Sequence, residues 1–392
     1  MIVAVPKEIA AGERRVALVP DAVKQLKGKG VDVVVERGAG AAAGFDDAAY
    51  ERAGATLEAD PKALLARADF VLKVQAPTER PDGSHEIDAM RPGCMLVGFL
   101  RPLDAPELAR RLAAANVTSF AVELVPRITR AQTMDALSSM SSLAGYRAVL
   151  LAAERLPRIF PMLVTAAGTI AAARVLVIGA GVAGLQAIGT ARKLGAVVEG
   201  YDVRAAVKEQ VESLGAKFVE MELDAGEAED KGGYAKELGE DFYRKQRELM
   251  ARVVEHSDVV ITTAAIPGKK SPVLITKEMV AAMAPGSVIV DLAAERGGNC
   301  ELTEADREVD AGGVKILGPT NPPATVPYHA SQMYSNNIVN FVKNMMKDGK
   351  FTIDTEDEIV RDTLVTRGRE VVNPRIRELL GLETAKAEGG AA

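Results

Sequence analysis

Short apolar runs alternate with amphipathic segments along most of the chain. In the first third, the apolar runs predict strands, and the segments between them, in which apolar residues recur every three or four positions, predict helices. The predicted strands are Ile2–Val5, Val31–Val35, Phe70–Val74, Met95–Phe99 and Val117–Val122. The predicted helices are Asp21–Lys27, Asp46–Arg52, Asp60–Ala66 and Asp104–Ala115, with Asp21, Asp46 and Asp104 expected at N-cap positions.

A second series of the same kind follows a long helix that we predict over Ser139–Arg155. Its predicted strands are Val175–Ile178, Val197–Tyr201, Lys217–Val219, Val259–Thr262, Val288–Asp291 and Val314–Leu317. A regular alternation of short strands with helices is typical of mostly parallel sheets, because each strand needs a crossover before the next one.

The C-terminal part begins with a second long helix, predicted over Ser331–Lys347. Beyond it, Ile359–Thr366 and Glu370–Val372 lie on either side of Arg367-Gly368, and this arrangement predicts a β-hairpin. These elements are too few to form a domain of their own, so we assign them to the first domain.

The pattern therefore predicts an α/β fold with two Rossmann-like domains. Each has a mostly parallel sheet, and we expect the two to be separated by an interdomain cleft and joined by two long helices. The expected first domain is discontinuous, at residues 1–138 plus 330–380, and the second covers 139–329, with a disordered tail at 381–392. The length of 392 residues also favours two domains.

Charge and composition exclude several classes of protein. The formal net charge is −6 and the basic residues alternate with acidic ones, so the clustered basic face of a nucleic-acid-binding protein is missing. Cys94 and Cys300 are far apart, which favours buried free thiols over a disulfide or a metal site. The N-terminus lacks a signal-peptide pattern, and Arg174 interrupts the apolar stretch 159–191, so we expect a cytoplasmic protein with no transmembrane segment.

The strongest local signal is a GxGxxG motif at residues 179–184, between a predicted strand and a predicted helix. Gly179 permits a tight turn, Gly181 lets the backbone approach a pyrophosphate, and Gly184 allows close helix–strand packing. Asp202 ends the next strand at a spacing close to the roughly 20 residues of the dinucleotide fingerprint, where it would accept hydrogen bonds from the adenosine ribose. The motif predicts one NAD(H) site per chain; the alternative is a Gly-rich turn of another α/β fold.

Two neighbouring features bear on this site. Arg204 lies just beyond Asp202 and leaves some tolerance of NADP(H) open. The segment Glu220–Glu240 is rich in charge and Gly and lacks apolar periodicity, so it is either a lid or a surface insertion. Tyr234 follows two Gly residues within this segment, and as part of a lid it would cover a bound nucleotide.

Further motifs carry a resemblance to a known family. They are VPKE (Val5–Glu8), GERRVAL (Gly12–Leu18), RAQTMDALSSMSSLAGYRAV (Arg130–Val149), GGYAKE (Gly232–Glu237), ITTAAIPG (Ile261–Gly268) and DLAAERGGN (Asp291–Asn299). With these motifs, nearly the whole chain resembles the NAD(H)-binding component, domain I, of the proton-translocating NAD(P) transhydrogenases. It resembles the alanine dehydrogenases more weakly.

The resemblance implies roles for particular residues. In the loop that ends at Ser138, it implies that four side chains contact the nicotinamide and its ribose: Arg127, Gln132, Asp135 and Ser138. It also implies that Tyr234 belongs to a mobile loop. Further cofactor contacts are expected from Val182, Ala183, Val203, Ala264 and Ala265. Because the 127–138 loop lies at the predicted domain junction, where a cleft is expected, the alternative for it is a polar interdomain hinge.

Alanine dehydrogenase is the main alternative activity. Reduction of an imine or a carbonyl needs a proton donor, and the resemblance implies a His for this step, with an Arg and a Lys holding the substrate carboxylate. Arg15 and Lys73 stand at the matching positions, but the segment Val97–Pro102 lacks the His, and a later catalytic Asp is replaced by Glu295. We therefore interpret Arg15 and Lys73 as structural ion-pair residues. Surface or capping roles are expected for the three histidines, His85, His256 and His329.

Hydride exchange between two nicotinamide rings needs alignment but no general acid or base. The missing acid therefore favours transhydrogenation between NAD(H) on this chain and NADP(H) on a partner domain. The resemblance further implies a homodimer, an NADP(H)-binding subunit or domain, and a membrane-embedded proton-conducting subunit that would hold the chain at the inner membrane. The alternatives are an alanine dehydrogenase-like amino-acid dehydrogenase and a catalytically silent NAD(H)-binding regulator.

Overall fold

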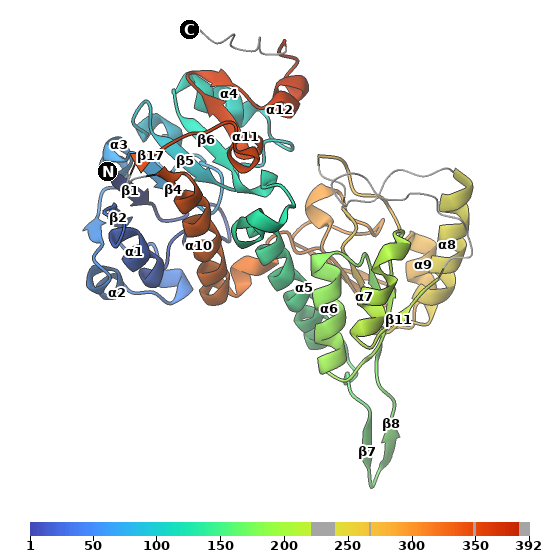
Figure 1. Cartoon of the computed structure of the whole chain (residues 1–392). Coiled ribbons are helices and arrows are strands. Elements are labelled where there is room, and N and C mark those ends of the chain that lie inside the picture. Colours follow the sequence, from blue (N-terminus) through green and yellow to red (C-terminus); the bar gives the residue numbers. More distant parts are fainter. Residues whose placement is uncertain (221–239, 266–267, 348–349, 384–392) are drawn as a thin grey trace. The chain divides into compact units, whose positions relative to one another are not determined.

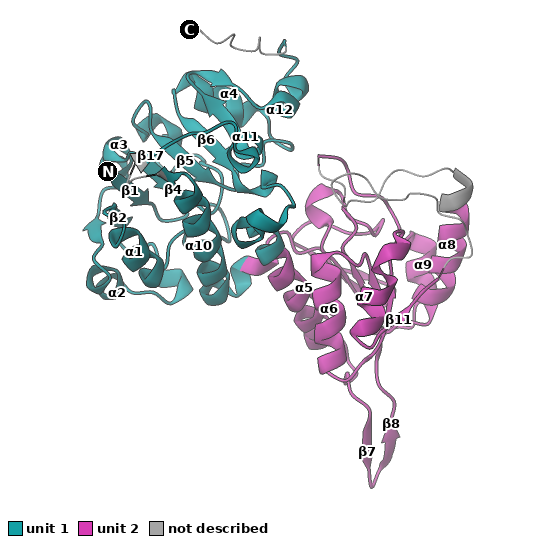
Figure 2. Ribbon diagram, in the orientation of Figure 1, with its two compact units in different colours: residues 1–140, 324–392 teal, residues 141–323 magenta. Residues whose placement is uncertain are grey.

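The chain folds into two compact units, which Figure 2 shows in different colours. The computed structural model describes residues 1–220, 240–265, 268–347 and 350–383. Unit 1 consists of Met1–Met140 and Ala324–Ala392, and unit 2 of Ser141–Pro323. Most of the segment Glu220–Glu240, with Tyr234, and most of the tail expected at 381–392 lie outside the described residues.

Unit 1 contains an eight-stranded sheet with the order β19-β18-β6-β5-β4-β1-β2-β3. Its strands are β1 (Ile2–Val5), β2 (Asp32–Glu36), β3 (Thr56–Glu58), β4 (Phe70–Leu72), β5 (Met95–Gly98), β6 (Thr118–Ala121), β18 (Leu364–Arg367) and β19 (Glu370–Val371). The strands from β3 to β6 pair in parallel, whereas β18 and β19 add an antiparallel edge beside β6.

Helices pack on this sheet (Figure 1). Apolar side chains of the sheet lie buried in a cluster with residues of these helices. They are α1 (Pro20–Lys27), α2 (Asp47–Arg52), α3 (Pro61–Arg67), α4 (Glu107–Ala114), α10 (Pro327–Asn344), α11 (Glu358–Thr363) and α12 (Pro374–Leu379). A small antiparallel pair, β16 (Met346–Lys347) and β17 (Lys350–Phe351), follows α10. Val71 and Leu96 of the sheet lie in one buried cluster with Leu65 of α3 and Leu112 of α4.

Unit 2 contains a seven-stranded sheet with the order β11-β10-β9-β12-β13-β15-β14. Its strands are β9 (Arg174–Ile178), β10 (Val197–Tyr201), β11 (Lys217–Phe218), β12 (Val259–Thr262), β13 (Val288–Asp291), β14 (Glu308–Ala311) and β15 (Val314–Leu317). All neighbours pair in parallel except β14, which is antiparallel to β15 at the edge. A separate hairpin of β7 (Leu163–Thr165) and β8 (Gly168–Ile170) projects from this unit (Figure 1).

Both faces of the unit 2 sheet are covered by helices. The helices are α5 (Ala136–Arg155), which begins in unit 1, α6 (Val182–Lys193), α7 (Lys208–Ser213), α8 (Glu240–Glu255) and α9 (Lys277–Ala282). Val175 and Val177 of β9 join a buried cluster with residues of α5 and α6, and Leu176 and Ile178 join another with residues of α8 and α9. Burial on both faces explains why these strands are continuous apolar runs.

The predicted fold class is confirmed: both units are α/β with mostly parallel sheets. Several local predictions were wrong. Ile359–Thr363 is helical and belongs to α11, because Asp357 accepts a hydrogen bond from the Ile359 N–H at 2.9 Å and caps a helix there. Only β18 and β19 form the predicted hairpin.

Two of the three expected N-caps were also wrong. Asp46 caps α2 as predicted, by accepting a hydrogen bond from the Ala49 N–H at 2.7 Å. Asp21 lies inside the first turn of α1, and Asp104 precedes Pro106, the N-cap of α4. Among the described elements, sequence periodicity missed β3, β7, β8, β14, β16 and β17, which are short strands at sheet edges or in separate two-stranded sheets, where burial imposes little pattern.

Each sheet contains six parallel strands in the same spatial order. The first three strands along the chain are added from the centre toward one edge, and the next three from the centre toward the other edge. The order is β3-β2-β1-β4-β5-β6 in unit 1 and β11-β10-β9-β12-β13-β15 in unit 2. In such sheets the connections diverge where the order reverses, which leaves a crevice at the carboxyl ends of the two central strands. The fold therefore places a potential binding site beyond β1 and β4 in one unit, and beyond β9 and β12 in the other.

None of the helices in the described part of the chain combines the length and the apolar character needed to cross a membrane.

Candidate functional site

The glycine loop of unit 2 lies at the carboxyl end of β9, beside the end of β12. Gly179 has a φ of +96°, which residues with a side chain rarely adopt, and a Cβ there would lie 2.5 Å from the Thr263 Oγ1. A Cβ on Gly184 would overlap the Gly179 carbonyl oxygen, so α6 can approach the loop only because this residue is glycine. A Cβ on Gly181, by contrast, would have no atom of the described residues within 4 Å.

Gly181 is the N-cap of α6, and its carbonyl accepts the Leu185 N–H at 2.8 Å. The amide groups of the first helical turn, at Val182, Ala183 and Gly184, have no acceptor within the helix. They form the positive end of the α6 dipole next to an open backbone surface. Unhindered amides at a helix N-terminus are the arrangement that binds a phosphate group, so this loop fits a dinucleotide pyrophosphate.

Asp202, just beyond β10, is bound to the glycine loop and to Arg204. Its carboxylate accepts the Ala180 N–H at 2.8 Å, and it accepts both the backbone N–H and the side-chain Nε of Arg204 at 2.9 Å. The Arg204 Nη2 completes a two-pronged ion pair at 2.9 Å, in which the Asp202 side chain is 7% exposed. Val203 packs partly buried against the adjacent core.

The end of β12 forms the second wall of this region. The Thr263 hydroxyl donates to the Gly179 carbonyl at 3.0 Å, which ties the β12–α9 connection to the glycine loop. Ala264 is half-buried and Ala265 is exposed. The side chain of Asn299 is fully buried and holds both backbone polar groups of Ala264, with the N–H at 3.0 Å and the carbonyl at 2.8 Å.

The predicted nicotinamide loop lies in unit 1. Residues Thr129–Met134 form a 3₁₀ helix that ends at Asp135. The Asp135 carboxylate accepts the N–H of Ser138 at 2.8 Å and its hydroxyl at 2.5 Å in the first turn of α5. Gln132 is exposed, as is Arg127. The loop is anchored from outside, because the Thr133 carbonyl accepts the Asn337 amide of α10 at 2.9 Å. Its backbone is therefore fixed while two of its polar side chains face solvent.

The four loop residues thus lie in unit 1, where Asp135 and Ser138 are in contact, and the glycines, Asp202 and the 263–265 segment come together in unit 2. Tyr234 lies outside the described residues. Sequence reasoning did not single out Thr263 or Asn299 as contributors to the site. Asn299 was part of the DLAAERGGN motif, but nothing in its spacing indicated contact with the end of β12.

The corresponding crevice of unit 1 contains buried charges instead of glycines. Lys73, just beyond β4, is fully buried and pairs with Glu86 at 3.0 Å and with Glu8 at 3.2 Å. Burial alone would lower the pKa of Lys73, but the two carboxylates outweigh it and raise this pKa, so the ammonium stays charged. Glu8 also accepts the Val74 N–H at 2.5 Å, and this links the ends of β1 and β4.

A second buried ion pair joins Arg15 to Glu13, a short distance along the chain from Glu8. It binds Glu13 with its Nη2 at 2.6 Å and its Nε at 2.7 Å, and Gln75 donates to the same carboxylate at 2.8 Å. Burial would raise the pKa of Glu13, yet the hydrogen bonds and charge of Arg15 lower it to about 2. Arg15 and Lys73 therefore lie in ion pairs, as predicted.

The histidines have local roles that match the sequence interpretation. His85 caps a short 3₁₀ helix, because its Nδ1 accepts the Ile87 N–H at 3.2 Å. His256 follows the C-terminal residue of α8 and is exposed, and His329 is exposed in the first turn of α10. Cys94 and Cys300 are buried free thiols, as expected.

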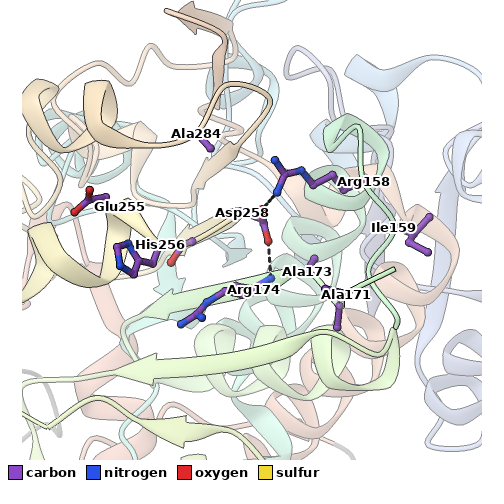
Figure 3. Close-up of a pocket in the computed structure, with 11 residues that line it drawn as sticks. Arg158, Ile159, Ala171, Ala173, Arg174, Glu255, His256, Asp258 and Ala284 are labelled. Atoms are coloured by element: carbon purple, nitrogen blue, oxygen red, sulfur yellow. Dashed lines mark hydrogen bonds and ion pairs between the residues drawn. The ribbon is translucent and has the colours of Figure 1, made fainter. Parts of the chain in front are cut away.

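A cavity of about 350 Å³ lies elsewhere in unit 2 (Figure 3). Arg158 pairs there with Asp258 at 2.6 Å, and the same carboxylate accepts the Arg174 N–H at 2.9 Å. Because Arg174 begins β9 and Asp258 precedes β12, this cavity is at the amino ends of the strands. The glycine loop is at their carboxyl ends, so the cavity is not part of the candidate site.

A parallel sheet with this strand order, a glycine loop after its first strand and a carboxylate after the next strand are the features of dinucleotide-binding α/β proteins. The N-terminal and C-terminal domains of the family "Alanine dehydrogenase/PNT" match residues 4–144 and 148–374. The chain belongs to this family.

Both transhydrogenase subunits and alanine dehydrogenases are among the relatives of this chain. The chain is 50% identical to a protein of Rhodospirillum rubrum that is named as the first part of NAD(P) transhydrogenase subunit alpha, over 96% of this chain and 99% of the relative. It is 33% identical to "Alanine dehydrogenase" of Bacillus subtilis, over 99% and 97%. The solved structure of a transhydrogenase from Sinorhizobium meliloti is 45% identical, with a TM-score of 0.86 over 95% of this chain and 100% of that one. Within its family, the sequence is of the transhydrogenase α-subunit type.

Proposed function

We propose that the chain is the NAD(H)-binding subunit of a proton-translocating transhydrogenase. The observation that carries the proposal is the glycine loop, where no described residue crowds Gly181 at the start of α6 and Gly184 lets the helix pack against Gly179. The pyrophosphate would bind the first-turn amides of α6, and Asp202 would accept the ribose hydroxyls. The 50% identity to a transhydrogenase subunit over nearly the full length supports this choice.

The proposed reaction moves a hydride from C4 of one nicotinamide ring to C4 of another, and that chemistry comes from the two cofactors. The work left to the protein is alignment. In our proposal Arg127 and Gln132, both exposed, orient the nicotinamide carboxamide, whereas Asp135 and Ser138 orient its ribose. The hydrogen bonds between Asp135 and Ser138 support this assignment because they hold both groups in place before the cofactor binds.

The second cofactor must bind elsewhere in this proposal. The chain has one GxGxxG fingerprint, and buried ion pairs of Lys73 occupy the equivalent crevice of unit 1. NADP(H) would therefore be bound by a partner domain, and a membrane-embedded subunit would conduct the protons. The chain would then lie at the inner membrane on its cytoplasmic side, held there by its partners.

We also propose that the chain forms a homodimer. The β7–β8 hairpin supports this, because its apolar residues are exposed: Met162 by 61%, Leu163 by 44%, Val164 by 74% and Ile170 by 49%. An isolated two-stranded hairpin is marginally stable in water, and grouped apolar side chains at a surface typically mark an interface.

A depression at the base of the hairpin supports the same proposal. It is lined mostly by apolar residues, including Leu156, Phe160 and Leu194. The hairpin and the depression belong to one unit, so a two-fold axis would allow each copy to offer both surfaces to the other.

An alanine dehydrogenase-like activity is the second candidate function. One observation favours it: Arg15 and Lys73 lie close to the crevice of unit 1, where a small substrate would bind in such an enzyme. Against it, the chain has no His in Val97–Pro102, and the buried carboxylates of Glu8 and Glu86 already neutralise Lys73.

The test is a hydride-transfer assay from NADPH to an oxidised NAD analogue. We expect no turnover by the purified chain alone and turnover after addition of an NADP(H)-binding transhydrogenase domain. Gln132→Asn should slow this transfer with little change in NADH affinity, because it shortens the side chain without changing its chemistry.

Pyruvate with ammonium and NADH serves as the parallel reaction. NADH consumption by the chain alone in that reaction would establish the amino-acid dehydrogenase instead, and NADH binding without turnover in either reaction would indicate a silent regulator.

A further inference from the structure

A buried polar network supports the second wall of the candidate site. It begins at Asp291, the last residue of β13, whose carboxylate is fully buried. Oδ1 accepts the Thr262 hydroxyl and the Ala293 N–H, both at 2.9 Å. Oδ2 accepts the N–H groups of Asn299 at 2.7 Å and Cys300 at 3.0 Å, together with the Thr303 hydroxyl at 2.7 Å.

These five hydrogen bonds compensate for the burial of a carboxylate that would otherwise be costly. They also fold the connection after β13 back on itself, so that Asn299 returns to the end of β12. Gly298 is required at the closest point: its φ is +80°, and a Cβ there would lie 2.7 Å from the Asp291 Oδ2.

Asn299 then holds the backbone beside the glycine loop through three side-chain hydrogen bonds. Its Oδ1 accepts the Ala264 N–H at 3.0 Å, and its Nδ2 donates to the carbonyls of Ala264 at 2.8 Å and Pro272 at 2.9 Å. Ala264 in turn lies close to the loop, since its nitrogen would be 3.3 Å from a Cβ on Gly179. A shift of the 263–264 backbone would therefore change the space beside Gly179.

We propose that Asn299 is a positioning residue for the dinucleotide, holding the Thr263–Ala265 backbone at the spacing from the glycine loop that the cofactor requires. It acts through Ala264 and not by contact with the reacting atoms. The inference rests on the proposed function, because it assigns a role within that NAD(H) site. Asp291 is the residue that places Asn299, through the hydrogen bond from the Asn299 N–H.

Asn299→Asp tests the proposal because it keeps the size and the acceptor of the side chain but removes both hydrogen bonds donated by Nδ2. The dissociation constant of NADH should rise roughly tenfold or more, since the two backbone carbonyls of Ala264 and Pro272 lose their donor. Asn373→Asp is the matched control: Asn373 is also buried, and its Nδ2 donates to the Asp362 carbonyl at 3.1 Å in unit 1. This control should leave NADH affinity unchanged.

The measurement is a titration followed by NADH fluorescence, together with a thermal melt. In the titration, the amplitude reports the folded fraction, whereas the dissociation constant does not. Thr303→Val is a milder variant that removes one of the five bonds to Asp291, and it should weaken NADH binding about two- to fivefold.

A lowered melting temperature of Asn299→Asp with an unchanged dissociation constant would show a merely structural role and overturn the proposal. The wild-type chain separates this result from a failure of the proposed function. If the wild-type chain itself does not bind NADH, the NAD(H) site is wrong, and the positioning role is lost with it.

Discussion

At the scale of single residues, Asp202 and Arg204 determine which dinucleotide the proposed site would accept. An arginine just after this carboxylate is the kind of side chain that can accommodate a 2′-phosphate, but Nε and Nη2 of Arg204 both donate to the Asp202 carboxylate. A phosphate at this position would meet the negative charge first and would have to compete for Arg204. The pair therefore favours NAD(H), although the sequence alone left tolerance of NADP(H) open.

Asp202→Ala should reverse this preference. NADH affinity should fall roughly 10- to 100-fold, because two hydrogen bonds to a charged acceptor are lost. NADPH affinity should rise, because Arg204 is released and the repelling charge is gone. Fluorescence titrations with both nucleotides measure the two effects.

The double variant Asp202→Ala/Arg204→Ala is the control for this experiment, and it should lose the gain in NADPH affinity. Unchanged NADH affinity in the single variant would exclude Asp202 as the ribose acceptor.

At the scale of elements, the packing of α5 against α6 depends on a residue without a side chain. A Cβ on Gly145 of α5 would overlap the Ala183 carbonyl oxygen in the first turn of α6. Since α6 also carries the glycine loop at its N-terminus, this contact supports the helix end that would bind the pyrophosphate. Helix–helix and helix–strand packing at Gly145 and Gly184 therefore fix α6 from two directions.

Gly145→Ala should destabilise the protein by about 1–3 kcal/mol, because the extra methyl group forces the two helix backbones apart. Gly189→Ala, on helix α6, is the matched control. Among the described residues, a Cβ at Gly189 would meet only Leu214 within 4 Å, at 3.9 Å, so this change should stabilise the protein by about 0.5–1 kcal/mol through the higher helix propensity of alanine. Urea unfolding followed by circular dichroism measures both. Equal stabilities of the two variants would contradict the close α5–α6 contact.

At the scale of the whole molecule, two units with the same strand order have acquired different crevices. Unit 2 offers open backbone amides beside glycines, whereas unit 1 has Glu8, Lys73 and Glu86 paired at the corresponding strand ends. Buried carboxylates there would repel a pyrophosphate. The proposed single dinucleotide site per chain would therefore reflect a difference in residues and not a difference in topology.

The proposed dimer is a property of the same scale. Val164→Ser combined with Ile170→Ser should shift the chain from dimer to monomer, because the hairpin would lose apolar area that the interface is proposed to bury. Light scattering after size-exclusion chromatography, over a range of concentrations, measures the mass directly. Leu379→Ser is the matched control, since Leu379 is 53% exposed on α12 in unit 1 and should leave the mass unchanged. A variant hairpin that stays dimeric would place the interface elsewhere.

The sequence by itself determined the elements that have a strong pattern. Strands buried on both faces, such as β9 and β12, are continuous apolar runs, and the GxGxxG motif has its meaning in a local strand–turn–helix unit. Local chemistry of this kind can be read along the chain, because the interacting residues are neighbours in sequence. For the same reason Asp46 was a correct N-cap, whereas Asp21 and Asp104 required the helix start to be known within two residues.

Only the tertiary structure decided which distant residues meet. Asn299 reaches Ala264, Glu86 reaches Lys73, and Asp202 reaches Ala180, and these partners depend on how strands and connections are ordered in space. A buried polar side chain carries no periodic signal, because its partner is chosen by the fold and not by its neighbours in sequence. The pattern of apolar residues therefore determined the α/β framework, and tertiary packing decided which crevice is open and which is closed by charge.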